Sequence, residues 1–319
     1  MKKEDFRIIF MGTPIFAVET LKLLVENKYN IVAVVTMPDK PAGRGHKLQQ
    51  SDVKKYALSQ NILVLQPEKL KDEEFLKTLK SLKADLNIVV AFRMLPEVVW
   101  DMPQYGTYNL HGSLLPQYRG AAPINWAIIN GEKETGVTTF KLVHEIDSGK
   151  IAYQSKIEIK ENDNAGIIHD KLMNVGAKLV MKTIDAIIDE TIELSAQDID
   201  KEELKTAPKI FKDTCRINWT VTAQDIHNFI RGLSPYPTAY TVLQREDESF
   251  IVKIFDALPI LHKHTLQPGT IVQSNQQTID IAVADGFVRV LELQVQGRKR
   301  MQTSAFLNGF SLLTTDQFK

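Results

Sequence analysis

The first part of the chain alternates between short apolar runs and segments whose apolar residues recur at helical spacing. Residues 8–11 form an apolar run that ends at Gly12, and apolar side chains then recur three or four positions apart over residues 16–25. A run followed by this spacing is typical of a strand that turns into a helix. The same alternation predicts strands at 31–35, 62–65 and 88–91 and helices at 53–58 and 75–82. Because the strands are apolar on both faces, we predict a parallel sheet covered by helices.

The pattern changes after this α/β region. Residues 151–159 alternate between apolar and polar side chains, as in a strand exposed on one face, and residues 167–188 have the spacing of a long helix. Residues 190–205 are rich in Asp, Glu and Lys and have little periodicity, which is typical of a linker. We therefore predict a first domain at 1–189, a linker at 190–208 and a second domain at 209–319.

The second domain has a different pattern. Its first periodic segment, residues 223–233, predicts a helix that ends before Pro235 and Pro237. Short strands are then predicted at 240–243, 250–254, 270–272, 278–283 and 288–295. About five short strands with Gly and Asp turns suggest a small barrel of the oligonucleotide-binding (OB) type. The predicted fold is thus α/β, with a Rossmann-like parallel sheet in the N-terminal domain and an OB-like β-barrel in the C-terminal domain.

Composition fits two ordinary globular domains. The chain has 319 residues, of which 44% are hydrophobic, and its 39 basic and 39 acidic residues cancel. A neutral chain has no general attraction to nucleic acid or to an anionic membrane, so a polyanion would have to meet a local basic patch. Two such patches occur, one at Arg44, His46 and Lys47 and one at residues 298–300.

Several classes of site and location are disfavoured. Cys215 is the only cysteine, which excludes an intrachain disulfide and a multi-cysteine metal site and fits a small buried hydrophobe. Gly12-Thr13-Pro14 lacks the glycine spacing of a dinucleotide-binding turn, so a nicotinamide cofactor is not expected. The first apolar run is too short for a signal peptide, and no run is long enough to span a membrane. We expect a cytoplasmic protein.

Three polar residues stand at predicted strand ends. Asn109 and His111 are two residues apart on one predicted strand, so their side chains share a face, and Asp147 precedes a turn at Gly149. Ligands of open α/β sheets bind at the carboxyl ends of strands. Each residue taken singly is more often structural. Together, an amide donor, an imidazole and a carboxylate form the set needed for acyl transfer to an amine.

The motifs around these residues resemble the folate-dependent formyltransferase family. The segments that carry the resemblance are 109–116, 119–123, 136–138 and 147–149, with further likeness at 8–14, 38–45 and 296–301. The resemblance covers essentially the whole chain. It implies 10-formyltetrahydrofolate as the formyl donor and the α-amino group of methionine on initiator tRNA as the acceptor. We expect a monomer with no membrane attachment, and no metal, since no cluster of His, Cys or carboxylate side chains has ligand spacing.

The resemblance assigns roles to individual positions. The catalytic residues fall on Asn109, His111 and Asp147. The folate site falls on Phe92, Arg93, Met94, Leu95, Ser113, Leu114, Leu115 and Pro116. The expected tRNA contacts are Lys40, Arg44, Lys47, Lys209, Arg298, Lys299 and Arg300. One departure stands out, because family members commonly carry Tyr-Gly where this chain has Phe92-Arg93, and we expect it to alter folate affinity or inhibitor preference.

Two other functions remain open at this point. Family members that formylate small molecules, such as glycinamide ribonucleotide, use the same Asn-His-Asp set. The loop at 37–50, where prolines and glycines disfavour regular structure, and the C-terminal domain argue for tRNA, since a small amine needs neither. The second alternative is a non-catalytic nucleic-acid-binding protein, which the neutral charge and the polar triad disfavour.

Overall fold

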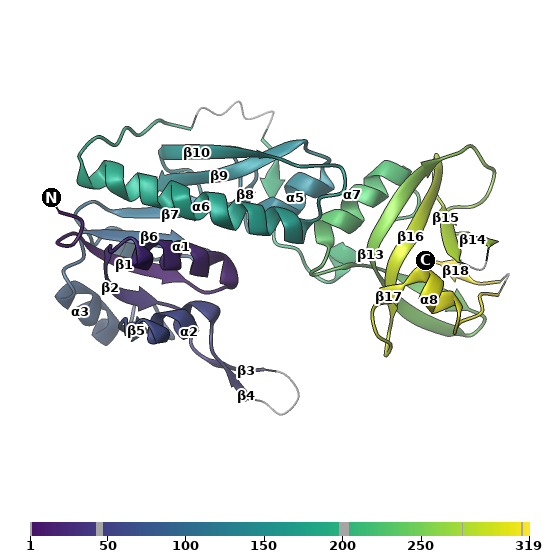
Figure 1. The fold of residues 1–319 in the computed structure, drawn as a ribbon, viewed down its shortest axis with the longest axis horizontal. Helices are drawn as coiled ribbons and strands as arrows, with labels where there is room; N and C mark the ends of the chain where they lie inside the picture. Colours follow the sequence, from purple (N-terminus) through teal and green to yellow (C-terminus); the bar gives the residue numbers. More distant parts are fainter. Residues whose placement is uncertain (1, 43–46, 198–203, 276, 314) are drawn as a thin grey trace. The chain divides into compact units, whose positions relative to one another are not determined.

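The computed structural model describes residues 2–42, 47–197, 204–275, 277–313 and 315–319. The chain forms two compact units (Figure 1). Unit 1 contains Met1–Gly120, Thr135–Ile157 and His169–Thr206, and unit 2 contains Ala121–Glu134, Glu158–Ile168 and Ala207–Lys319. Two segments of the predicted first domain therefore pack in unit 2. The domain boundaries inferred from sequence stay a prediction, and part of the predicted linker lies outside the described residues.

Unit 1 is built on a sheet whose described strands follow the order β10-β9-β7-β6-β1-β2-β5. The strands are β1 (Arg7–Gly12), β2 (Asn30–Val35), β5 (Val64–Leu65), β6 (Leu86–Val90), β7 (Thr107–His111), β9 (Glu134–Lys141) and β10 (Ile151–Glu158). From β5 to β7 all neighbours pair in parallel, which confirms the predicted Rossmann-like sheet. Strand β9 runs antiparallel to β7. The chain order reverses beside β1, the position at which open α/β sheets bind ligands.

Helices cover both faces of this sheet. They are α1 (Ile15–Glu26), α2 (Asp52–Ser59), α3 (Glu73–Ser81), α4 (Glu97–Trp100) and α6 (Ala165–Ile188). On one face, Met11 and Val89 form a buried cluster with Leu79 of α3 and Val99 of α4. On the other face, α6 packs closely on the sheet, because the Thr183 hydroxyl meets that of Thr139 at 2.7 Å. The sheet is thus buried on both sides, as its apolar strands predict.

Local signals fix where two of these helices begin. The Ser51 hydroxyl accepts a hydrogen bond from the backbone N–H of Lys54, and the Asp72 carboxylate accepts from two backbone N–H groups of the first turn of α3. Such caps satisfy donors that a helix start leaves unpaired. The predicted helices at 53–58 and 75–82 are therefore present with starts set by their caps.

The region 37–50 differs from the irregular loop expected from its prolines and glycines. Its described parts form an antiparallel pair of strands, β3 (Lys40–Ala42) and β4 (Lys47–Gln49). Pro41 is tolerated because a two-stranded hairpin leaves each strand with an edge that needs no N–H donor. An ion pair of 2.6 Å between Asp39 and Lys54 ties the base of this hairpin to α2.

Unit 2 contains an antiparallel, barrel-like sheet, as predicted. Its strands are β12 (Ala239–Arg245), β13 (Glu248–Leu261), β14 (Ile271–Asn275), β15 (Thr278–Ala282), β16 (Gly286–Val295), β17 (Met301–Gln302) and β18 (Gln317–Phe318). The helices of this unit are α5 (Pro123–Ile129), α7 (Ala223–Leu233), α8 (Thr303–Leu307) and a 3-10 turn at Asp213–Cys215. The long strand β13 shifts register between Ile254 and Ala257, a bulge that lets it bend around the core.

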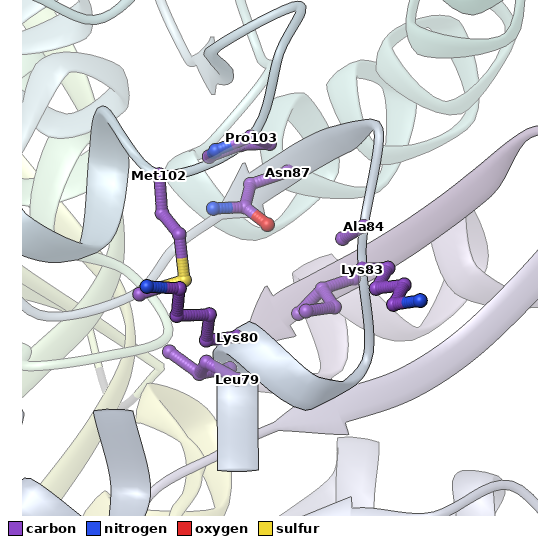
Figure 2. A pocket seen from close by; sticks show the side chains of 8 residues that line it. Leu79, Lys80, Lys83, Ala84, Asn87, Met102 and Pro103 are labelled. Atoms are coloured by element: carbon purple, nitrogen blue, oxygen red, sulfur yellow. The ribbon is translucent and has the colours of Figure 1, made fainter. Parts of the chain in front are cut away.

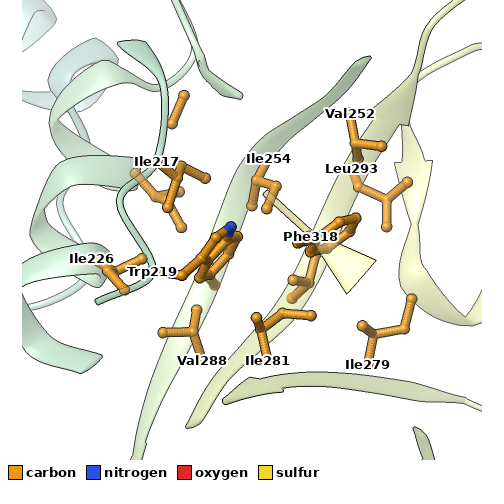
Figure 3. Packing of buried hydrophobic residues seen from close by; sticks show 14 of the residues in the cluster. Ile217, Trp219, Ile226, Val252, Ile254, Ile279, Ile281, Val288, Leu293 and Phe318 are labelled. Carbon is orange, nitrogen blue, oxygen red and sulfur yellow. The ribbon is translucent and has the colours of Figure 1, made fainter. Parts of the chain in front are cut away.

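Two stacked aromatic rings belong to the hydrophobic core of unit 2 (Figure 3). The rings of Trp219 and Phe318 stack with centroids 5.8 Å apart, and the Trp219 N–H donates to the hydroxyl of Thr241. Cys215 is buried in the same cluster, as expected for a small hydrophobe. Helix α5 is fixed to α7, because the side-chain amide of Asn125 donates to the carbonyl of Gly232 at 2.7 Å. This contact explains why α5 belongs to unit 2.

Candidate active site

Strand β7 places the two candidate catalytic side chains of its sequence on one face of the sheet. Asn109 and His111 lie there, while Leu110 points to the opposite face and touches the helix α6 at Gly176. The amide of Asn109 is half-buried and makes no hydrogen bond within the described part of the chain. It is therefore free to donate to a substrate.

His111 is buried, with 6% of its surface exposed, and its protonation is fixed by its neighbours. Its Nε2 lies 2.9 Å from the carbonyl oxygen of Tyr118. A carbonyl can only accept, so Nε2 carries the proton and Nδ1 keeps its lone pair in the neutral ring. Nδ1 faces the carboxylate of Asp147 across 3.9 Å, which is an ion-pair distance but too long for a direct hydrogen bond.

Opposing effects act on the pKa of His111. Burial is the largest and lowers the pKa below its ordinary value of 6.5, because the low dielectric disfavours the charged ring. Asp147 and the Tyr118 carbonyl act in the opposite direction, and the charge of Arg119 lowers the pKa further. The neutral ring with a free Nδ1 is thus the resting form near pH 7.

Asp147 is held in an unusual backbone conformation. Its φ is +52°, in the left-handed region that Asp tolerates better than most residues. Its carboxylate accepts a hydrogen bond of 3.0 Å from the backbone N–H of Gly120. The turn folds back so tightly that a Cβ on Gly149 would lie 1.7 Å from the carbonyl oxygen of Lys141. Only glycine fits there, so the turn that aims Asp147 at His111 depends on it.

The predicted folate segment 113–116 is fixed through Thr138 of β9. The buried Thr138 hydroxyl donates to the carbonyl of Ser113 at 2.7 Å and accepts from the backbone N–H of Leu115 at 3.1 Å. Gln154 adds a third bond to the same hydroxyl and also donates to the Leu115 carbonyl. Ser113 and Leu115 are themselves buried, whereas Leu114 and Pro116 are partly exposed. The segment therefore has a defined backbone.

The other predicted folate segment, 92–95, follows β6, the parallel neighbour of β7. It starts beside Ala91, whose φ of +47° is rare for a residue with a side chain. The Arg93 guanidinium donates to the backbone carbonyls of Pro67 and Glu68, so this departure from the family pattern braces a neighbouring loop. Met94 is 73% exposed, whereas Leu95 is buried in the hydrophobic cluster of that face.

The predicted tRNA contacts are distributed over both units. Lys40 and Lys47 lie on the β3–β4 hairpin, and Arg44 lies outside the described residues. In unit 2, Lys209 and Lys299 are exposed. Arg298 stacks over the ring of Phe310 with its charge exposed. Arg300 is less available to bind a phosphate, because its guanidinium pairs with Glu292 and its Cζ lies 4.1 Å from the centroid of the Phe255 ring.

A cavity of unit 1 lies near the amino ends of strands β6 and β7, away from the carboxyl end that carries His111 (Figure 2). It is lined by Asn87 of β6, Met102 and Pro103 before β7, and two lysines of the α3 region, Lys80 and Lys83. None of the predicted site residues lines it. The candidate catalytic groups instead meet at the carboxyl end of β7.

The expectations from sequence included no metal site and no membrane-spanning segment. The described residues contain no group of three or more His, Cys, Asp and Glu side chains placed to hold a metal ion. None of the helices in the described ranges is long and apolar enough to cross a membrane. The expectations on metal and cellular location stay predictions.

One residue that touches the Asp147 turn was not predicted from the sequence. Gln197 lies in the predicted linker, and its amide donates to the backbone carbonyls of Asp147 and Gly149 at 2.9 and 2.8 Å. No motif marks it, because the surrounding segment is polar and aperiodic.

Comparison with known proteins shows the family to which the chain belongs. The Formyl transferase family matches residues 6–184, and the family of its C-terminal domain matches residues 209–311. A protein of Bacteroides thetaiotaomicron named methionyl-tRNA formyltransferase is 58% identical over 315 residues, which are 98% of this chain and 98% of that relative. A protein of Flavobacterium johnsoniae with the same name is 50% identical over 97% of each chain.

Solved structures share the fold at lower identity. One is a sugar 3N-formyl transferase, WlaRD, crystallised in the presence of dTDP and 5-N-formyl-THF, with a TM-score of 0.64 and 21% identity over 92% of this chain and 99% of that one. Another is an N-formyltransferase from Helicobacter canadensis in complex with folinic acid and dTDP-3-aminofucose, with a TM-score of 0.64 and 22% identity over 93% of this chain and all of that one. The two family matches together span most of the sequence, and the relatives at 50–58% identity span nearly all of it. The chain belongs to the formyl transferase family.

Proposed function

We propose that the chain transfers the formyl group of 10-formyltetrahydrofolate to the α-amino group of methionine carried by initiator tRNA. The observation that carries the proposal is the free amide of Asn109 beside a neutral His111 that faces Asp147 at the carboxyl end of β7. The relatives named methionyl-tRNA formyltransferase support the acceptor, since they align over both units. The solved relatives named with folate compounds support the donor.

The reaction forms a bond from the amine nitrogen to the formyl carbon and breaks the bond from that carbon to the folate nitrogen. The attacking amine must be neutral, and α-amino groups titrate at roughly 7.7–8.0, so a useful fraction is neutral near pH 7. Negative charge develops on the formyl oxygen. The Asn109 amide is the donor that stabilises it, an interaction whose removal typically costs about 100- to 1,000-fold in turnover.

One proton must leave the amine and one must reach the departing folate nitrogen. The free lone pair of His111 Nδ1 is the base that accepts the first proton, and the same site returns it. Asp147, at 3.9 Å from Nδ1, stabilises the imidazolium that forms in between. Burial, to which the charge of Arg119 adds, lowers the pKa of His111 and keeps the ring neutral before the reaction.

The folate segments position the donor. Segment 113–116, fixed by Thr138, presents backbone groups next to His111, and segment 92–95 presents the exposed Met94 from the adjacent strand. We assign the tRNA to the basic residues of the β3–β4 hairpin and to Lys209, Arg298 and Lys299, with Arg44 kept from the sequence prediction. Arg300 is the weakest member of this set, because Glu292 already pairs with it.

Incubation of the purified chain with 10-formyltetrahydrofolate and charged initiator tRNA tests the proposal. Formylmethionyl-tRNA should appear, and glycinamide ribonucleotide should not be formylated at a comparable rate. The Asn109→Ala variant should lose about 100- to 1,000-fold in kcat. Asn174→Ala is a matched control, because that amide is bonded on the exposed side of α6. Absence of formylmethionine with the wild type, or wild-type turnover in Asn109→Ala, would contradict the assignment.

A further inference from the structure

The polar segment between the two sequence-predicted domains contributes an amide to the surroundings of the reacting centre. Gln197 uses every hydrogen-bonding position of its amide. Its Nε2 donates to the carbonyls of Asp147 and Gly149, and its Oε1 accepts from the guanidinium of Arg119, at 3.1 Å from Nε. All four residues belong to unit 1.

The orientation of this amide follows from its partners. Two carbonyl oxygens can only accept, and a guanidinium can only donate. A rotated amide would set its oxygen against two carbonyls and its N–H groups against a cation. The contact is therefore specific for an amide of this length, which has donors on one atom and an acceptor on the other.

The backbone that carries Gln197 is anchored as well. Ser195 and Ile151, the first residue of β10, exchange two backbone hydrogen bonds of 2.8 and 2.9 Å. Gln197 thus extends from a fixed point to both carbonyls that flank Ser148. The turn it holds has its first residue, Asp147, at a φ of +52°, a conformation that persists only where the surroundings enforce it.

We propose that Gln197 is a positioning residue that holds the Asp147 carboxylate at its distance from His111 and keeps Arg119 beside the same ring. The proposal deepens the proposed function and rests on it. It makes the segment between the domains part of the catalytic geometry. Gln197 does not touch the reacting atoms, so it acts only through Asp147 and Arg119.

Two substitutions separate its contacts. Gln197→Met keeps the length of the side chain and removes all of its hydrogen bonds, whereas Gln197→Glu keeps an acceptor for Arg119 and removes both N–H donors. Gln60→Met is a matched control on the exposed end of α2. A displacement of about 1 Å in a catalytic group costs up to about 100-fold in turnover. We expect kcat to fall about 10- to 100-fold in both Gln197 variants, with the KM values for folate and for tRNA within about twofold of wild type.

A double-mutant cycle with Asp147→Ala distinguishes positioning from a general loss of structure. If Gln197 acts through the Asp147 carboxylate, adding Gln197→Met to Asp147→Ala should lower kcat by less than about twofold more, because effects of coupled residues do not add. Full additivity of the two losses would overturn the proposal. Wild-type turnover in Gln197→Glu would overturn it too, because the Arg119 contact would then suffice.

Hydrogen–deuterium exchange provides a measurement that needs no substrate. The backbone amides of residues 147–149 should exchange faster in Gln197→Met than in wild type or in Gln60→Met, with melting temperatures and circular dichroism recorded alongside. Unchanged exchange in this turn would overturn the inference even if the chain formylated no tRNA. Absence of formyl transfer by the wild type, with faster exchange in the variant, would reject the proposed reaction and leave the positioning contact supported.

Discussion

Replacing Thr138 by valine tests how the folate segment 113–116 is held. Thr138 is fully buried, and its hydroxyl makes three hydrogen bonds, to the Ser113 carbonyl, the Leu115 N–H and the Gln154 amide. Valine has nearly the same shape, so no cavity forms. The substitution therefore removes the bonds and leaves the packing.

The size of the effect follows from the groups left without a partner. The Leu115 N–H and the Ser113 carbonyl each lose the threonine hydroxyl, while Gln154 keeps its bond to the Leu115 carbonyl. A buried polar group without a partner costs about 1–3 kcal/mol. We expect the free energy of unfolding to fall by about 2–4 kcal/mol, which corresponds to a Tm lower by roughly 5–15 °C in a unit of this size. The KM for the folate donor should rise and the KM for tRNA should stay constant.

Urea and thermal unfolding, followed by circular dichroism, measure the first effect, and steady-state kinetics measure the second. Thr78→Val in α3 is the control, because that exposed hydroxyl bonds only to the carbonyl of Glu74 one turn earlier. Such a surface change should stay within about 0.5 kcal/mol of wild type. If Thr138→Val were as stable as Thr78→Val and kept the wild-type folate KM, segment 113–116 would be held by something other than this hydroxyl.

Three further predictions concern charge. Asp147→Asn should lower the pKa of His111, because it removes the negative charge that faces Nδ1 at 3.9 Å and favours the protonated ring; an unchanged NMR titration of His111 would contradict this. Because burial puts the folded-state pKa of His111 below 6.5, the unfolded chain binds the proton more tightly between the two values. The contribution of His111 to the free energy of unfolding should therefore fall as the pH drops below about 6.5 and become constant below the folded-state pKa, so the total free energy of unfolding should fall less steeply in His111→Gln. Arg44→Ala and Arg298→Ala should each weaken tRNA binding without changing the folate KM. The slope of the logarithm of the tRNA binding constant against the logarithm of the salt concentration should become shallower by roughly 0.7–0.9 for each phosphate that the variant no longer neutralises. Arg44→Lys should also be impaired, since lysine has no planar fork; salt slopes equal to wild type would place the tRNA elsewhere.

Most of the sheet could be predicted from the sequence because its signals are local. The apolar runs before Gly12 and at 31–35 and 88–91 are strands of the observed parallel sheet, and Ser51 and Asp72 mark helix starts by their own side chains. The strand pair at 40–42 and 47–49 could not be predicted. The two strands pair with each other at an exposed position, where a proline is tolerated and periodicity carries no information.

That the candidate catalytic pair on β7 shares one face was also predictable, because a two-residue spacing on a strand puts side chains on one face. Asp147 could be singled out by its place before a glycine turn, but nothing local says that this turn returns to His111. The Tyr118 carbonyl that fixes the histidine tautomer and the amide of Gln197 could not be predicted. Both act through backbone groups, and any sequence supplies those at every position, so only the folded chain shows which of them meet.

The division of the chain between the two units decides how the role of the C-terminal barrel can be tested. A cut near Lys205 looks natural from the sequence, because the preceding segment is polar. In the structure, however, residues 121–134 and 158–168 pack in unit 2, where Asn125 of α5 bonds to the carbonyl of Gly232 at the end of α7, and the Arg231 guanidinium donates to the carbonyl of Asp163. Removing α7 would expose these two segments, which lead directly into strand β9 and helix α6 of unit 1. A truncated protein that fails to bind tRNA would then have lost the packing of unit 1 as well as a binding surface. Substitution of exposed charges such as Arg298 and Lys299 leaves these contacts intact, so it is the perturbation from which a loss of tRNA affinity can be assigned to unit 2.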